Sequence, residues 1–171
     1  MHFPHAWKNA IITPGFIKGT AGDVSNYRPI SLTFVASKLM ERIIAAKIYA
    51  HLNSNSLLSC TQHGFIKNRS TCTNLLEAMN DWTVAVQNKN SVTVAYIDFS
   101  RAFHTVSHEK LLACLLGYGI RGDLLYWIMQ FFSNCTHQTK VGLALSEIAK
   151  LTSGVIQGSG DWSCYVHYIH R

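Results

Sequence analysis

The hydrophobic and polar positions of the chain change period several times, so the sequence predicts short strands interleaved with helices. Trp7 to Phe16 is β-prone but interrupted by Pro14-Gly15, which predicts a strand or hairpin arm followed by a turn. A Gly/Ser/Thr-rich loop follows. Residues 26–32 then predict a short extended segment, because Pro29 biases Arg28 away from the helical region.

Four segments have helical character. The first runs from about Phe34 to His51 and places four apolar residues on one face, namely Val35, Leu39, Ile43 and Ala46. A second helix is capped by Ser70 or Thr71 and runs to about Gln87. Residues 107–116 and 123–132 predict two more helices, separated by a glycine-rich turn.

Two further segments predict strands in the second half of the chain. Val92 to Asp98 is an apolar β-type run, and residues 138–145 and 150–155 predict a hairpin around Leu145-Ser146-Glu147. There is no internal repeat and no low-complexity block. Helices around short antiparallel strands favour an α+β fold.

Composition narrows the class of protein. The chain has 171 residues, enough for one core-bearing domain with room for two subdomains, and 48% of them are hydrophobic. The formal net charge is +6, which favours a nucleic-acid or anionic partner only modestly. The N-terminus lacks a basic leader followed by an apolar stretch, and no apolar run approaches the roughly 20 residues of a membrane span. We therefore expect an intracellular protein, nuclear or cytoplasmic and not secreted.

Cysteine and histidine spacing does not predict a metal or disulfide framework. The five cysteines form no CxxC pair, which favours reduced thiols. Two histidine pairs stand close together, His2/His5 and His104/His108, the second at the spacing of two ligands on one helix face, but a structural or accidental role is favoured over metal ligation for both.

The segment most suggestive of chemistry is Tyr96–Phe103. A strand that ends on Asp98 would present a carboxylate, which is the type of ligand that Mg²⁺ prefers. Alternatively, Asp98 caps the next turn. Phe103 is either a core residue or the wall that excludes a ribose 2′-hydroxyl. Phosphoryl transfer between nucleotides relies on positioning and on charge neutralisation, commonly by two metal ions.

Other candidates are weaker taken one at a time. Arg28, Lys38, Lys67 and Arg69 stand in or beside segments that could face phosphates, although a solvated surface position explains each of them. Residues 154–159 place a glutamine among small residues, where a backbone could approach a base pair closely.

Taken together, these segments resemble reverse transcriptases of non-LTR retrotransposons, the jockey-like and related LINE elements. The matching motifs are NYRPISL (26–32), KLMERII (38–44), QHGFIKNRST (62–71), YIDFSRAFHTV (96–106), GIRG (119–122) and SGVIQGS (153–159). They stand in the family's order and cover the chain from Trp7 to Ser159.

The resemblance implies the fingers and an incomplete palm of a right-hand polymerase, with fingers over 1–89 and partial palm over 90–159. It implies that Asp98 is the first metal-binding aspartate, with the carbonyl of Phe99 as a further ligand of Mg²⁺. It implies that the incoming nucleotide is contacted by Arg28, Lys38, Phe99, Ser100, Arg101, Ala102, Phe103, Gln157 and Gly158, with Phe103 as the steric gate. Lys67 and Arg69 would contact nucleic acid. The implied partners are an RNA template, a DNA primer and deoxynucleotides.

Three departures from the family pattern predict an inactive chain. His104 stands where the family has Asp, and Ile66 where an Arg follows Gly-Phe. Residues 160–171 differ from the family's sequence, which continues toward a Tyr/Phe-Ala-Asp-Asp motif that supplies the other metal-binding carboxylates. In residues 148–171 the only acidic residue is Asp161. Back-translation of this tail in a shifted frame restores VIGPAMFIIYI after Ser159, which suggests a one-base insertion in the source gene. A non-catalytic nucleic-acid-binding remnant and a translated pseudogene are the alternatives.

Overall fold

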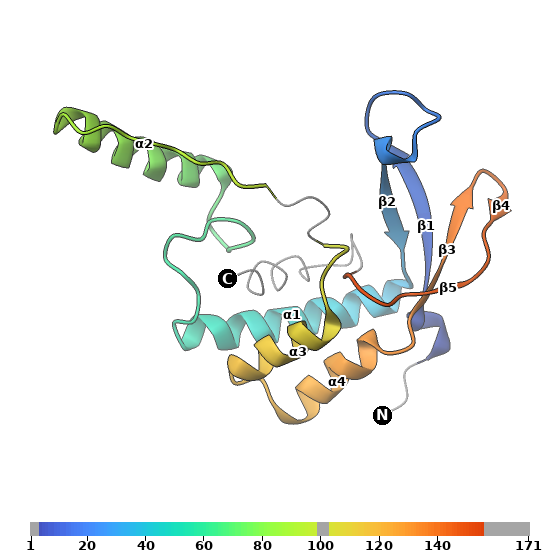
Figure 1. The fold of residues 1–171 in the computed structure, drawn as a ribbon. Helices are drawn as coiled ribbons and strands as arrows, with labels where there is room; N and C mark the ends of the chain where they lie inside the picture. The colour runs from blue at the N-terminus through green and yellow to red at the C-terminus, as the bar shows by residue number, and fades with distance from the viewer. Residues whose placement is uncertain (1–3, 99–102, 156–171) are drawn as a thin grey trace.

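The computed structural model describes residues 4–98 and 103–155 of the chain. Three helices form one layer, a small sheet rises from one end of that layer, and a fourth helix, α2, projects away from it (Figure 1). The fold is therefore mixed, with a partial sheet, as the sequence predicts.

The helices lie close to where the sequence places them. They are α1 (Val35–Ser54), α2 (Thr71–Gln87), α3 (His108–Gly117) and α4 (Gly122–Phe132), with 3-10 turns η1 (His5–Lys8) and η2 (Val24–Asn26) near the N-terminus. The predicted cap of α2 is confirmed at Ser70, which forms a reciprocal capping box with Thr73. Ser107 caps α3 in the same way, by accepting a hydrogen bond from the Lys110 N–H.

The sheet has the order β2-β1-β3-β4, and β5 also pairs with β3. Its strands are β1 (Asn9–Phe16), β2 (Tyr27–Leu32), β3 (Thr136–Val141), β4 (Ala144–Leu145) and β5 (Ala149–Lys150). β1 is antiparallel to β2 and parallel to β3. The sheet thus joins strands from the two ends of the described chain, on both sides of the boundary proposed between fingers and palm.

The predicted turn at Pro14-Gly15 is wrong, because β1 continues through both residues. Pro14 faces Pro29 across the β1–β2 pair. The N–H of Ile17 donates to the Asn26 carbonyl (2.9 Å), and hydrogen-bonded and non-hydrogen-bonded pairs alternate along an antiparallel ladder. The Pro14–Pro29 pair therefore falls at a non-hydrogen-bonded position, where two missing N–H groups cost the ladder nothing.

The predicted hairpin around residues 145–147 is displaced. The chain turns earlier, at Gly142-Leu143, so that Val141 pairs with Ala144. Gly142 has φ +60°, which a two-residue hairpin loop requires at its first position. β3 still pairs with the segment near residue 150, through Thr136 opposite Lys150.

The predicted strand at Val92–Asp98 is also wrong. This segment has no regular secondary structure, and all of its residues are exposed. Figure 1 shows it returning from the far end of α2 toward the helical layer. A β-prone run becomes a strand only when a neighbouring strand accepts its hydrogen bonds, and the described residues place none beside it.

The core lies between α1, α3 and α4. Its buried apolar residues are Ala45, Ile48, Leu52, Val106, Leu111, Leu115, Ile120, Trp127, Ile128, Phe131, Phe132 and Val155. α1 contributes the stripe Ser37–Glu41–Ala45–Ile48–Leu52, whereas Val35 and Leu39 are 80% and 61% exposed. The face of α1 that was predicted to be apolar is therefore not the buried face.

Among the described residues, no helix is both long and apolar enough to cross a lipid bilayer.

Candidate functional site

The segment that follows Asp98 and the segment that precedes Gln157 are joined by hydrogen bonds. The Val155 N–H donates to the Phe103 carbonyl (2.9 Å), and the Gly154 N–H donates to the Val106 carbonyl (2.8 Å). The Ser153 hydroxyl donates to the His104 carbonyl (3.1 Å). Residues 103–106 and 153–155, nearly 50 positions apart in sequence, therefore form one structural unit, which we call the junction.

Gly154 is required at the centre of the junction. Its φ is +87°, and a Cβ there would lie 2.9 Å from the His104 carbonyl oxygen and 3.0 Å from the Phe103 carbonyl oxygen. Only glycine allows both the backbone conformation and the close approach. The Gly154 carbonyl also lies 2.7 Å from Nε2 of His108, whose ring packs on Phe132 at a centroid distance of 4.8 Å. His108 thus links the junction to the first turn of α3 and to the core.

Phe103 is half-buried and packs against the core cluster, so the structure is compatible with both predicted roles. Asp98 is exposed at the end of the irregular segment 91–98. The other residues assigned here from the resemblance, Phe99, Ser100, Arg101, Ala102, Gln157 and Gly158, lie outside the described residues. The junction thus brings the described parts of the YIDFSRAFHTV and SGVIQGS motifs to one place.

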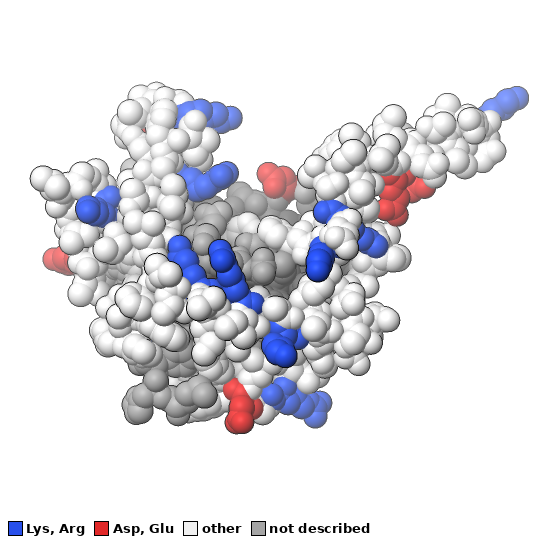
Figure 2. All heavy atoms as spheres, turned by 180° about the vertical axis from the view of Figure 1, so that it is seen from behind, with Lys and Arg blue, Asp and Glu red and all other residues white. Residues whose placement is uncertain are grey.

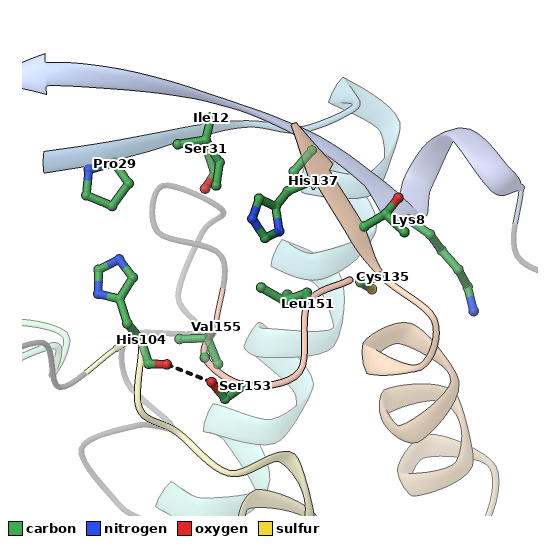
Figure 3. A pocket seen from close by; sticks show the side chains of 13 residues that line it. Lys8, Ile12, Pro29, Ser31, His104, Cys135, His137, Leu151, Ser153 and Val155 are labelled. Carbon is green, nitrogen blue, oxygen red and sulfur yellow. Dashed lines mark hydrogen bonds between the residues drawn. The ribbon is translucent and has the colours of Figure 1, made fainter. Parts of the chain in front are cut away.

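A cavity lies between the sheet and the junction (Figure 3). Its volume is about 80 Å³. β1 and β2 supply one wall with Ala10, Ile12, Pro29 and Ser31, and the opposite wall is formed by His104, Leu151, Ser153, Gly154 and Val155. His137 reaches into it from β3. The cavity thus touches both segments of the junction.

Lys8 borders the cavity but is committed elsewhere. Its Nζ donates to the carbonyl oxygens of Gln130 and Ser133, both at 3.0 Å, and to the Ser133 hydroxyl at 3.2 Å. These acceptors lie at the C-terminal end of α4, where a cation also complements the helix dipole. Figure 3 shows the Lys8 side chain directed away from the cavity.

The predicted cationic residues do not converge on the junction. Pro29 and Ser31 of β2 line the cavity. Because successive side chains of a strand point to opposite faces, Arg28 lies on the other, exposed face of β2 and points away from the cavity. Lys38 is half-buried on the first turn of α1. Figure 2 shows Lys and Arg side chains bordering the hollow at the middle of the rear face.

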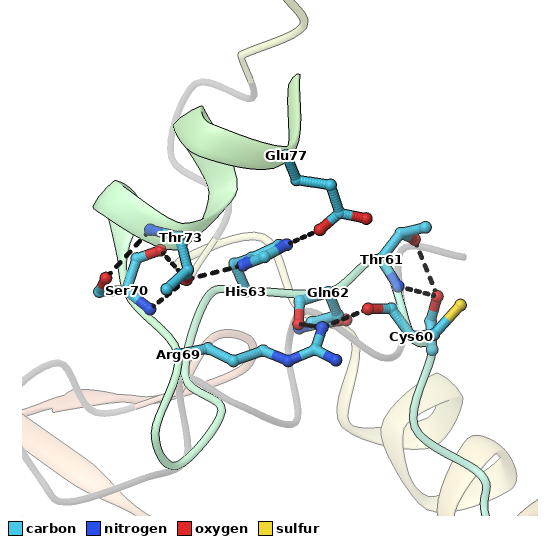
Figure 4. Close-up of polar contacts among 9 residues, drawn as sticks. Cys60, Thr61, Gln62, His63, Arg69, Ser70, Thr73 and Glu77 are labelled. Carbon is cyan, nitrogen blue, oxygen red and sulfur yellow. Dashed lines mark hydrogen bonds and ion pairs between the residues drawn. The ribbon is translucent and has the colours of Figure 1, made fainter. Parts of the chain in front are cut away.

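The segment 60–70 is organised by Arg69 (Figure 4). The Arg69 guanidinium donates to the carbonyls of Cys60 and of Gln62, the latter at 2.6 Å. Lys67, by contrast, is exposed. Arg69 therefore has a structural role in closing this loop, and Lys67 is the cation of the pair that faces solvent.

His63 ties the same loop to α2. Its Nδ1 lies 3.0 Å from the Thr73 hydroxyl and its Nε2 lies 2.7 Å from Glu77 Oε2. Thr73 is also the capping-box partner of Ser70. The loop and the first two turns of α2 are thus one polar network, which the sequence motif alone did not reveal.

The described residues do not form a complete metal centre. Across residues 4–98 and 103–155, no group of three or more His, Cys, Asp and Glu side chains gathers where a metal ion could bind. A two-metal centre needs several converging carboxylates, and Asp98 alone does not satisfy that requirement.

Two cavity residues were not predicted from the sequence. His137 belongs to β3, whose polar sequence gives no motif signal, and Cys135 immediately precedes that strand. Burial raises the pKa of the Cys135 thiol, with smaller opposing influences from Lys8, which lowers it, and Glu41, which raises it.

The fold and the junction define a mixed α/β domain in which residues 103–106 contact residues 153–155. Residues 17–160 match the family described as reverse transcriptase (RNA-dependent DNA polymerase). The chain belongs to the reverse transcriptase family, and its relatives make it a reverse transcriptase domain of the non-LTR retrotransposon type. The resemblance found in the sequence motifs is confirmed.

Three relatives illustrate this kinship. The chain is 31% identical over 160 residues to the RNA-directed DNA polymerase from mobile element jockey of Drosophila melanogaster, covering 92% of this chain and 17% of that protein. It is 31% identical over 112 residues to the probable RNA-directed DNA polymerase from transposon BS of the same species, covering 65% of this chain and 12% of that protein. It is 26% identical over 141 residues to the Pol polyprotein from type-1 retrotransposable element R2 of Popillia japonica, covering 82% and 19%. The chain thus spans less than a fifth of each of these relatives.

Proposed function

We propose that this chain forms the fingers and part of the palm of an RNA-directed DNA polymerase, and that the junction is the floor on which a deoxynucleotide rests. The observation that supports this most directly is the set of hydrogen bonds between residues 103–106 and 153–155. They hold Phe103 beside the segment that leads to Gln157 and Gly158. A sugar gate and a base-pair contact must be adjacent if they are to act on the same nucleotide.

The individual roles follow the same proposal. Asp98 would be the first carboxylate of the metal site, with the Phe99 carbonyl beside it, and Phe103 the steric gate. The remaining nucleotide contacts would come from Lys38, Ser100, Arg101 and Ala102. Because Arg28 lies on the other face of β2 and Lys67 is exposed, these two cations suit the template backbone better than the triphosphate.

We further propose that the 171-residue polypeptide does not polymerise by itself. The family's chemistry uses Mg²⁺ held by several carboxylates, and Asp161 is the only acid that follows Glu147 in this sequence. Removing ligands from a two-metal site removes most of the rate that the metals supply. The proposed frameshift would explain why residues 160–171 lack the expected motif, and the genomic sequence of the locus would test it.

Primer extension tests the catalytic part of this proposal. The assay mixes the purified chain with an RNA template, a DNA primer, deoxynucleotides and Mg²⁺. We expect no incorporation of deoxynucleotides into the primer that depends on Asp98. Asp98→Ala is the informative variant, and Asp81→Ala, an exposed acid on α2, is its matched control. Incorporation that Asp98→Ala abolishes and Asp81→Ala retains would overturn the proposed inactivity.

The second candidate function is nucleic-acid binding without catalysis. The net charge of +6 and the Lys and Arg side chains around the rear hollow favour it. RNA binding should then weaken steeply with salt, because bound cations displace counterions from the phosphates, and Asp98→Ala should leave it intact. Absence of any salt-sensitive RNA binding by the wild-type chain would refute this candidate.

A further inference from the structure

Residues 92–97, which follow α2, form an exposed segment with the composition of a strand. Their sequence, Val-Thr-Val-Ala-Tyr-Ile, contains no charged residue, no proline and no glycine. Segments of about six residues with high strand propensity and these properties pair readily with identical segments of other chains. Every residue of the segment is exposed, and Tyr96 and Ile97 are 86% and 81% exposed.

The backbone of this segment has no strand beside it. Among the described residues, no hydrogen bond involves a backbone N–H or carbonyl of residues 91–98. The preceding helix, α2, buries none of its residues and projects away from the helical layer, so another molecule can reach the segment (Figure 1). An extended backbone carries donors and acceptors along both edges, and a second extended backbone can satisfy them.

We propose that residues 92–97 are a self-association site, at which the segment pairs as an antiparallel β-strand with the same segment of a second copy of this chain. The proposal goes beyond the proposed function and does not depend on it. Because the segment is uncharged, its copies can approach without like charges meeting inside the pair, although the whole chain carries a formal net charge of +6.

The edges of the described sheet are poorer partners for the segment. β2 is the outer strand on one side, and Pro29 stands in a non-hydrogen-bonded pair with Pro14, so its nitrogen faces the free edge and supplies no donor there. On the other side, β4 and β5 contain two residues each. A second copy of the segment therefore offers a longer strand edge, with a donor at every residue.

Charges at the two ends of the segment favour the antiparallel orientation. Lys89 precedes the segment and Asp98 follows it, and both are exposed. An antiparallel pair brings the Lys89 end of one copy near the Asp98 end of the other, whereas a parallel pair in register places like charges together. With Val94 opposite Val94, Val92 lies opposite Tyr96, and such aliphatic–aromatic pairs stabilise antiparallel strands. A two-stranded ribbon is marginally stable, so further copies should add at its free edges.

Sedimentation velocity of the purified chain at increasing concentration tests the proposal, with thioflavin T fluorescence as the measure of stacked strands. The wild-type chain should form dimers and larger species whose fraction and fluorescence rise with concentration. Val94→Lys should raise the concentration needed for association about tenfold or more, because like charges then meet at the centre of the pair. Since the segment has no regular secondary structure, this substitution should leave the circular dichroism of the monomer unchanged.

Val86→Lys is the matched control. It makes the same change on α2, where Val86 is 64% exposed, and it should leave the association unchanged. An effect of Val86→Lys as large as that of Val94→Lys would assign the association to the apolar side chains of α2 and overturn the proposal. A wild-type chain that stays monomeric at every concentration would also overturn it.

Carbodiimide crosslinking tests the orientation of the pair. In a mixture of unlabelled and heavy-isotope-labelled chains, the Lys89 ammonium and the Asp98 carboxylate should become joined as an amide between a labelled and an unlabelled copy. If the chain associates but this mixed crosslink does not form, antiparallel pairing of residues 92–97 is refuted.

Discussion

Substituting Gly154 by alanine should separate the two segments of the junction. The added Cβ would lie 2.9 Å from the His104 carbonyl oxygen, 3.0 Å from the His104 Cα and 3.0 Å from the Phe103 carbonyl oxygen. All three neighbours are backbone atoms, so no side chain can rotate out of the way. Either residues 153–155 move away from residues 103–106, or the φ of +87° changes.

The expected cost has two parts. A non-glycine residue in a left-handed conformation costs about 1–2 kcal/mol. Moving the segments apart stretches the bonds from the Gly154 N–H to the Val106 carbonyl and from the Val155 N–H to the Phe103 carbonyl, each worth about 0.5–1.5 kcal/mol. The total loss of unfolding free energy is roughly 2–5 kcal/mol, which for a chain of this size lowers the thermal midpoint by roughly 4–20 °C.

Urea and thermal unfolding, followed by tryptophan fluorescence, measure this loss because Trp127 lies in the core beside the junction. Gly117→Ala is the control, since a Cβ at the end of α3 meets nothing within 4 Å. That variant should be neutral or more stable by up to about 1 kcal/mol. If Gly154→Ala unfolds within 0.5 kcal/mol of the wild type (about the scatter of such measurements), the close approach at the junction is refuted.

Two further predictions concern β3 and its surroundings. Lys8→Met should lower the unfolding free energy by about 1–2 kcal/mol, because the carbonyls of Gln130 and Ser133 lose a charged donor at the end of α4. Urea unfolding measures this loss. Lys18→Met removes the same charge at an exposed position and should have little effect. Alkylation by iodoacetamide, read by peptide mass spectrometry, should reach exposed Cys60 and Cys72 well before Cys135. Burial raises the Cys135 thiol pKa and so lowers the reactive thiolate fraction at every pH below it; equal labelling rates would contradict the buried position of that thiol.

The helices could be predicted because their signals are local. Ser70 places its hydroxyl where the Thr73 N–H needs an acceptor, and the two residues are only three positions apart. Ser107 acts in the same way at α3. The junction could be predicted only in part. Phe103 and Gly154 were identified by their motifs, but their hydrogen-bonded contact depends on a chain closure of nearly 50 residues that no local pattern encodes.

The strands were less predictable because pairing is not a property of one segment. Val92–Asp98 has the composition of a strand but no partner among the described residues, whereas polar β3 becomes the centre of the sheet because β1, β4 and β5 all pair with it. The parallel pairing of Asn9 with Thr136 joins positions at opposite ends of the described chain. Strand propensity measures how well side chains suit a pleated, half-buried surface, and the surface itself is decided by such distant partners.

The orientation of α1 shows the same dependence on partners. Helical periodicity places Val35, Leu39 and Ile43 on one face, yet the residues packed inward are Ser37, Glu41 and Ala45, followed by Ile48 and Leu52. Ala45, Ile48 and Leu52 of α1 belong to the same core cluster as Trp127 and Phe131 of α4, whose rings stack at a centroid distance of 5.3 Å.

Burying the Glu41 side chain requires hydrogen bonds in the interior, and the Ser37 hydroxyl supplies one at 3.0 Å, one helical turn away. Hydrophobicity alone ranks these two residues as surface positions, because it does not register the hydrogen bond between them. The buried face of α1 therefore includes a local polar pair beside the apolar residues Ala45, Ile48 and Leu52, and the stripe of Val35, Leu39 and Ile43 remains exposed.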